Sequence, residues 1–356
     1  MTKWLLSRRR VRQVLAVSFG ICCSILNAEL AEQSASNLSY KPLSARIERY
    51  TSELDELLEI NAEIRVLAQG FDWSEGPLWV NDKTDPYLLL SDVPQNKIFK
   101  WTARGGITEF MSPLGYAGDN GDFLREPGTN GLIRLDADTI IAADHGVRGL
   151  SRIKLADQSK ITFIKHFDSM SFNSPNDLVM SSSGQIFFTD PPYGLKGLNR
   201  SPYKMLGFNG VFRVDNGGHV VLIDKDLSFP NGIGLSPDGR SLYVANSDPQ
   251  APLWKKYVLS VTGEVVQSAV FNDASSSVAA GELGLPDGLA VDHMGNIFAS
   301  GPGGVHIFKP SGKLLGLIRV DRPVSNCTFG GVHGNTLFIT ADDLLLSVDT
   351  KTKGLL

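Results

Sequence analysis

Six residues with side-chain oxygens recur along the chain at spacings of 55, 46, 55, 56 and 39 residues, each at the start of a similar short segment. They are Glu75, Asn130, Asn176, Asn231, Asp287 and Asn326. Carboxylate and amide oxygens are the ligands that hard divalent cations prefer, and the two carboxylates together would balance the charge of one such ion. We therefore predict a divalent cation site, with Ca²⁺ expected and Mg²⁺, Mn²⁺ or Zn²⁺ as alternatives. No His, a usual zinc ligand, belongs to the set.

Each of these positions begins a pair of short strands joined by a turn. The clearest pair occupies residues 232–235 and 241–245, and the turn between them is Ser-Pro-Asp-Gly over residues 236–239. Pro presets φ, Asp can bond its own backbone, and Gly accepts a positive φ. The rest of each period has room for two more strands, and four antiparallel strands per repeat are typical of a propeller blade. The sequence therefore predicts an all-β fold, a six-bladed β-propeller, with one large β-sandwich as the alternative.

A closed ring of blades would bring the six residues together. The innermost strands of a propeller run side by side along a central channel, so equivalent positions at their starts converge on one mouth of that channel. A single Asn at such a position is more simply a turn former. Glu75 is a poor turn former, however, and all six positions carry oxygen. This agreement favours a shared ring of ligands.

The first residues of the chain have the pattern of an export signal. Residues 1–28 combine an Arg-rich start with an apolar run from Val14 to Leu26 and contain no acidic residue. The Ser7–Arg10 run also permits a twin-arginine signal, and a retained membrane anchor is the alternative. We expect a periplasmic or secreted mature protein. The predicted organisation is a cleaved signal peptide (1–28), a flexible leader (29–44) and a propeller domain (45–356).

Charge and cysteine content restrict the partners of the mature chain. Loss of the signal would remove five positive charges, so the formal charge would fall from −4 to −9. An acidic protein without basic clusters is a poor ligand for nucleic acid or for an anionic membrane, and we expect neither as a partner. Cys327 would be the only cysteine left, which predicts no internal disulfide and a buried thiol that packs as a small apolar group.

Two segments before the first repeat have recognisable patterns. Residues Ala45 to Ile60 contain four glutamates and are expected to form a short helix. Residues Glu63 to Ala68 partly alternate between polar and apolar side chains, as a strand does. We predict that this strand pairs with Leu344–Val348 near the other end of the chain and so closes the last blade.

Loops between the repeats supply candidate substrate contacts. Residues 115–128 are rich in glycine and lead into Asn130, so they form a candidate lid, with a simple surface loop as the alternative. His145, Arg148 and Tyr193 follow second strands that return to the mouth, and we assign them to substrate binding together with Asn130. The motifs of acyl-enzyme, ATP and dinucleotide chemistry are missing from the sequence.

Several motifs in a fixed order resemble the regucalcin (senescence marker protein 30)/gluconolactonase family, and especially its exported bacterial gluconolactonases. They are Ser74–Pro77, Asn173–Leu178, Thr189–Leu195, Pro230–Asp238, Leu285–Gly288 and Ser325–Gly330. The resemblance covers about residues 60–350. It implies a six-bladed propeller that holds one divalent metal at the channel mouth and hydrolyses small-molecule sugar lactones, of which glucono-1,5-lactone is the expected substrate.

The resemblance also implies roles for individual residues. The family's metal ligands match Glu75, Asn231 and Asp287, with Asn176 as a further ligand or a substrate contact, and Asp287 matches the acid assigned as general base. Regucalcin-type members carry an Arg where this chain has Ser174. If that Arg binds sugar hydroxyls, another group does so here, for which Arg148 and Tyr193 are candidates. The alternatives are an organophosphate-hydrolysing propeller and a calcium-stabilised propeller that only binds ligands; a strictosidine-synthase-like condensation matches the motifs less well.

Overall fold

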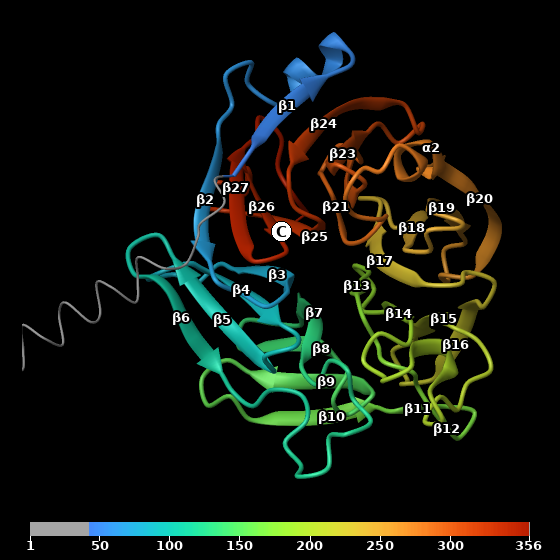
Figure 1. The fold of residues 1–356 in the computed structure, drawn as a ribbon. Helices are drawn as coiled ribbons and strands as arrows, with labels where there is room; N and C mark the ends of the chain where they lie inside the picture. Colours follow the sequence, from blue (N-terminus) through green and yellow to red (C-terminus); the bar gives the residue numbers. More distant parts are fainter. Residues whose placement is uncertain (1–42, 356) are drawn as a thin grey trace, which may run out of the picture. The chain divides into compact units, whose positions relative to one another are not determined.

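Strands make up most of the regular structure in residues 43–355, which is the part of the chain that the computed structural model describes. Six antiparallel sheets, five of four strands and one of five, surround a central channel, and each sheet is one blade (Figure 1). The predicted all-β, six-bladed β-propeller is therefore confirmed. The predicted signal peptide and all but the last two residues of the predicted leader lie outside the described residues.

Within each blade the first strand is innermost, and the following strands lie progressively outward. Blades one to three contain β3 (Ser74–Val80), β4 (Tyr87–Asp92), β5 (Lys97–Thr102) and β6 (Gly106–Met111); β7 (Thr129–Arg134), β8 (Thr139–Asp144), β9 (Gly149–Lys154) and β10 (Lys160–Ile164); and β13 (Leu178–Met180), β14 (Ile186–Asp190), β15 (Gly210–Val214) and β16 (Val220–Asp224). Blades four to six contain β17 (Pro230–Leu235), β18 (Ser241–Asn246), β19 (Leu253–Leu259) and β20 (Val265–Asp273); β21 (Leu289–Val291), β22 (Ile297–Gly301), β23 (Gly304–Phe308) and β24 (Leu314–Val320); and β25 (Val324–Gly330), β26 (Thr336–Ala341), β27 (Leu344–Asp349) and β2 (Ile64–Gln69).

A few short elements lie outside this plan. They are β1 (Ala45–Arg49), the hairpin β11 (His166–Phe167) and β12 (Met170–Ser171), the 3₁₀ turns η1 (Ser52–Glu56) and η2 (Leu198–Arg200), and the helix α2 (Ser275–Ala279). No helix within residues 43–355 has the length and apolar content needed to span a bilayer.

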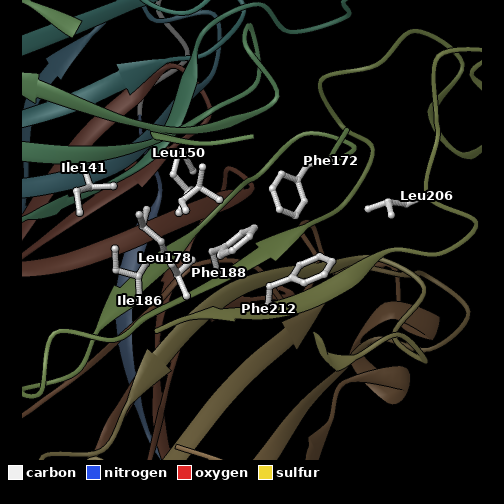
Figure 2. Packing of buried hydrophobic residues seen from close by; sticks show 11 residues of the cluster. Ile141, Leu150, Phe172, Leu178, Ile186, Phe188, Leu206 and Phe212 are labelled. Atoms are coloured by element: carbon white, nitrogen blue, oxygen red, sulfur yellow. The ribbon is translucent and has the colours of Figure 1, made fainter. Parts of the chain in front are cut away.

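The hydrophobic core lies between neighbouring blades, so the middle strands are buried on both faces. On β8, Ile141 packs toward blade three, whereas Ile140 packs in the cluster shared with blade one. Figure 2 shows the cluster between blades two and three, in which the rings of Phe188 and Phe212 stack at 5.3 Å and Phe172 meets both edge-on. Burial on two faces explains why β8 is a continuous apolar run and does not alternate.

Both ends of the propeller domain contribute to blade six. β2 pairs antiparallel with β27, with Ile64 opposite Val348, and the two strands lie side by side in Figure 1. The predicted closure of the ring is therefore confirmed. Cys327 on β25 is buried and unpaired, as predicted.

The predicted helix over residues 45–60 is wrong. Its first part is β1, which adds a fifth strand to blade five by pairing with β24, and its second part is only the 3₁₀ turn η1. The glutamates do not form the polar face of a helix but pair across to other elements. Glu48 contacts Arg319 of β24 at 2.6 Å, and Glu53 contacts Lys313 at 2.7 Å. Tertiary pairing thus overrides the local helical composition.

Candidate active site

The six repeat positions meet at one end of the channel, where each begins or just precedes an innermost strand. Glu75, Asn130, Asn231 and Asn326 lie on β3, β7, β17 and β25, and Asn176 and Asp287 lie two residues before β13 and β21. Contacts between neighbouring blades close the ring, since the Asn326 amide lies 3.5 Å from the Glu75 carboxylate. Convergence of the six positions, predicted from the repeat, is therefore observed.

Glycines after four of the ring residues set how closely the innermost strands approach. A Cβ at Gly76 or Gly232 would collide with the carbonyl group of the next blade's ring residue, Asn130 or Asp287. A Cβ at Gly131 would collide with the Asp177 carboxylate and the Asn176 carbonyl, and one at Gly288 would collide with the side-chain amide of Asn326. The lack of a side chain thus allows each innermost strand to touch the following one, which keeps the mouth narrow.

Hydroxyl groups bond neighbouring blades together just outside this ring. Each of five hydroxyls donates a hydrogen bond to a backbone carbonyl of the following blade. The pairs are Ser91 with Asn130, Thr189 with Asn231, Ser247 with Pro286, Ser300 with Ser325, and Ser325 with Ser74. At the remaining junction the Gly131 amide donates to the Asn176 carbonyl at 2.8 Å. The ring positions are therefore fixed by their backbones as well as by their side chains.

Three carboxyl groups share the buried space at this end of the channel. Burial and the negative charge of Asp177 raise the pKa of Glu75 to about 8, against smaller lowering by the Gly76 amide and Asn326. Burial, with the charges of Glu75 and Asp177, raises the pKa of Asp287 well above its ordinary value. Burial also raises the pKa of Asp177 to about 6. Without a cation, these groups resist ionisation together.

The unpaired oxygens of the ring fit a hard cation. Asp287 Oδ1 and Asn130 Oδ1 are buried and have no hydrogen-bond partner, an unfavourable state that a cation or a ligand hydroxyl would relieve. Among the described residues, no three His, Cys, Asp or Glu side chains form a metal-binding cluster. A cation bound here would therefore take amide oxygens as well as carboxylates.

Of the three substrate contacts predicted in the loops, Tyr193 is the one that interacts with ring residues. Burial and the negative charge of Asp287 raise the pKa of its hydroxyl, and the side chains of Ser247 and Asn231 oppose this increase. The Asn231 amide in turn donates to the Ser247 hydroxyl at 2.9 Å. Tyr193 therefore faces the same space as two ring residues.

His145 and Arg148 are not placed as direct contacts for a substrate bound at the ring. His145 is fully buried, and burial lowers its pKa to about 3, so the imidazole is neutral. Arg148 donates from Nε to the carbonyls of Phe172 and Asn173 and lines a separate cavity of about 580 Å³ that Tyr203 also lines. The ring and these two side chains are thus not brought into one cluster.

Ser174, where related regucalcins carry an Arg, has a supporting role. Its hydroxyl donates to the Pro191 carbonyl at 2.6 Å and accepts the Gly194 amide at 2.9 Å. It therefore holds the Pro-Pro-Tyr-Gly loop that carries Tyr193. Ser174 therefore does not supply the positive charge that an Arg side chain would bring to this position.

Sequence reasoning missed two acidic residues. Asp177 accepts the amide of Ile233 at 3.3 Å and lies 3.5 Å from the Asn326 amide, beside a cavity of about 880 Å³ along the channel. Glu126 belongs to the Gly-rich loop, and its charge contributes to raising the pKa of both Glu75 and Asp287. Asp177 follows a ring residue directly, which was the one available signal; nothing in the sequence distinguished Glu126.

The Gly-rich loop, residues 115–128, is fastened at both ends and in its middle. Tyr116 donates to the Pro127 carbonyl at 2.9 Å and Gly128 donates to that of Val93 at 3.0 Å. Arg125 donates to the carbonyl of Gly194 at 2.8 Å, on the loop that carries Tyr193. In this structure the predicted lid is a loop that is hydrogen-bonded to blade three through Gly194.

Fold and site together define a six-bladed β-propeller with a ring of carboxylate and amide oxygens at one end of its channel. A family model described as SMP-30/Gluconolactonase/LRE-like region matches residues 73–343. The chain belongs to this family.

Individual relatives agree with this assignment. The chain is 40% identical over 361 residues to a gluconolactonase of Zymomonas mobilis, which covers 99% of this chain and 100% of that protein. A solved gluconolactonase structure from Xanthomonas campestris has 26% identity and a TM-score of 0.72, covering 87% of this chain and 98% of the other. The calcium-binding regucalcin of Agrobacterium tumefaciens shares the fold at 20% identity and a TM-score of 0.66, covering 83% and 96%.

Proposed function

We propose that this protein is a metal-dependent hydrolase of sugar lactones, with glucono-1,5-lactone as its substrate. The observation that carries the proposal is the Asp287 carboxylate, which is buried among ring oxygens with Oδ1 unpaired. Full-length similarity to a gluconolactonase supports the reaction class. The family and its calcium-binding member support a divalent cation, for which we propose Ca²⁺.

Glu75, Asn231 and Asp287 would hold the cation, with Asn176 beside them as a ligand or a substrate contact. When bound, the cation would polarise the lactone carbonyl and stabilise the negative charge that develops on its oxygen. Its positive charge would also favour ionisation of Asp287, whose pKa is otherwise raised by burial and by Glu75. An ionised Asp287 can accept a proton.

Asp287 would act as the general base of the reaction. It takes a proton from the water that attacks the carbonyl carbon, the ring C–O bond then breaks, and the departing ring oxygen receives a proton to give the hydroxy acid. Tyr193 and Asn130 would orient the substrate, since Asn130 belongs to the ring and Tyr193 interacts with ring residues. His145 and Arg148 would act from behind this layer.

Removal of the metal tests the central claim. Exhaustive chelation should abolish lactone hydrolysis, measured with a pH indicator after subtraction of spontaneous hydrolysis, and a divalent cation should restore it. A fluorophosphate assayed in parallel tests the organophosphatase alternative. Full activity in protein without detectable metal would refute the proposal.

Two variants separate a ligand from a base. Asn231→Ala should weaken cation binding, and excess cation should restore much of the activity by mass action. Asp287→Asn keeps an oxygen near the cation but removes the proton acceptor, so a loss of about 10²- to 10⁴-fold in kcat should persist at saturating cation. Recovery of Asp287→Asn at high cation would show that Asp287 is only a ligand.

We also propose export, on the strength of the Arg-rich, acid-free first residues. Mass spectrometry of the protein from its native cells should find a mature chain that begins near Glu29. An intact chain from Met1 in the cytoplasm would contradict this proposal.

A further inference from the structure

Glu126 is a carboxylate outside the ring that faces the same polar space. Its side chain is 14% exposed, and burial raises its pKa to about 7 despite the opposing charge of Arg125. Its charge contributes to raising the pKa of Tyr193 as well as those of Glu75 and Asp287. Glu126 is partly exposed, lies four residues before Asn130 of the ring and is bonded through its backbone to Gly194 beside Tyr193, which places its carboxylate near the mouth.

The position of Glu126 is fixed from two sides. Its own backbone amide and that of Arg125 donate to the carbonyl of Gly194, which ties it to the loop that carries Tyr193. The Nδ1 atom of His145 lies 3.7 Å from Glu126 Oε2, and both ring nitrogens of His145 are otherwise unpaired. A movement of less than about 1 Å would bring the neutral imidazole N–H into hydrogen-bond range of the carboxylate. His145 itself is fully buried, so it does not contact a ligand directly and can act through the Glu126 carboxylate.

Hydrogen-bond acceptors without partners occur at this end of the channel, namely Asn130 Oδ1 and Asp287 Oδ1. An ionised Glu126 accepts only, and the nearby buried Asn130 Oδ1 is an acceptor without a partner. A surface of acceptors suits a ligand rich in donors, and hydroxyl groups are the donors of a sugar lactone. The Ser174 hydroxyl is not free for this purpose, because it donates to the Pro191 carbonyl. Arg148 donates from Nε to the Phe172 carbonyl, and its Nη2 is buried without a partner.

We propose that Glu126 determines specificity for hydroxylated lactones by accepting hydrogen bonds from ring hydroxyls, and that His145 is the residue that positions its carboxylate. This inference rests on the lactone hydrolysis proposed above. It predicts that Glu126 contributes to binding of the polyol part of the substrate and not to the chemistry at the carbonyl.

Kinetics with two six-membered lactones test the assignment. With the cation-loaded protein, Glu126→Ala should lower kcat/KM for glucono-1,5-lactone by roughly 10- to 100-fold through KM, as the loss of hydrogen bonds to a charged acceptor does. The same variant should leave kcat/KM for δ-valerolactone, which lacks ring hydroxyls, within about two-fold of wild type. Asp122→Ala is the matched control, because it removes an exposed carboxylate from the same loop.

Conservative variants distinguish recognition from folding. Glu126→Gln keeps an acceptor and should fall between wild type and Glu126→Ala, and it replaces Glu126→Ala if that variant does not fold. His145→Asn retains a donor and should raise KM for the sugar lactone less than His145→Leu does. Combining His145→Leu with Glu126→Ala should add little to the effect of Glu126→Ala alone.

The possible results distinguish failure of the Glu126 assignment from failure of the proposed function. Equal losses for both lactones, or no loss for either, would overturn the specificity role of Glu126. A wild-type protein that hydrolyses neither lactone would refute the proposed function itself, and this inference with it.

Discussion

Glu75→Gln should stabilise the protein when no metal is present, although it removes a proposed ligand of the cation. Glu75 is 2% exposed and, in the metal-free state, its carboxyl has a pKa raised to about 8 by burial and by Asp177. In the unfolded chain the same carboxyl ionises near its ordinary value of 4.5. Between these two values the native state binds the proton and the unfolded state does not, so stability falls as pH rises.

The size of the effect follows from this interval. Each pH unit above 4.5 lowers the free energy of unfolding by up to about 1.4 kcal/mol, which gives on the order of 3 kcal/mol at pH 7. A glutamine cannot ionise, keeps an acceptor for the Gly76 amide and escapes this penalty. We therefore expect Glu75→Gln in chelator to melt on the order of 5 °C above wild type at pH 7.

Thermal unfolding in chelator and in excess Ca²⁺ provides the assay. The difference between variant and wild type should vanish near pH 4, grow towards pH 8, and reverse in Ca²⁺, because only the wild type gains strongly from binding. Glu63→Gln, at an exposed position, is the control and should change nothing. A difference that does not depend on pH, or a destabilised variant in chelator, would refute the reasoning.

Three further predictions concern the ring, the core and the first strand. Gly232→Ala should force the Asp287 backbone outward, lower cation affinity in calorimetry at least ten-fold and destabilise the fold by about 1–3 kcal/mol; unchanged affinity would contradict the packing argument. Phe188→Ala should lower the free energy of unfolding in urea by about 3–5 kcal/mol with KM unaltered, and a loss below 1 kcal/mol would count against the inter-blade core. Arg319 chiefly lowers the pKa of Glu48 to about 2, so this pair stabilises the fold above pH 4.5 and the contribution is lost as pH falls towards 2. Glu48→Gln should therefore cost less than about 1 kcal/mol at pH 7 and flatten the acid limb of the stability curve, and an unchanged acid limb would argue against the pairing.

The repeat allowed the fold and the ring to be predicted because each blade places its first inner residue at the same point of the channel. When the same position of each repeat carries the residue, closing the six blades into a ring is enough to bring the six residues together. The strand formed by residues 64–69 was also predictable, since a ring needs a partner for the last blade. β1 was not predictable, because its partner strand β24 and Arg319, the partner of Glu48, are far away in the sequence.

The positions of Asp177 and Glu126 could not be predicted from the repeat, because they depend on features that do not recur from blade to blade. Asp177 lies one residue after a ring position, and in a regular strand its side chain would point away from the ring. β13 begins only at Leu178, however, so Asp177 is outside the strand. The Asp177 carboxylate can therefore accept a hydrogen bond from Ile233 of the next blade. Glu126 belongs to an irregular loop whose place is set by the backbone of Gly194. Such contacts between distant loops leave no mark in a single sequence.

Because of the glycine contacts between innermost strands, the width of the channel mouth depends on all the blades together. Each of four blades rests on the next through a position without a side chain, and the hydroxyl bonds repeat this dependence outside the ring. An added or deleted blade would therefore change the distance between Glu75 and Asp287 even though neither residue is altered. Variation in this architecture should be confined to the loops, where Glu126 and Tyr193 lie, while the contacts between innermost strands keep the blade number fixed.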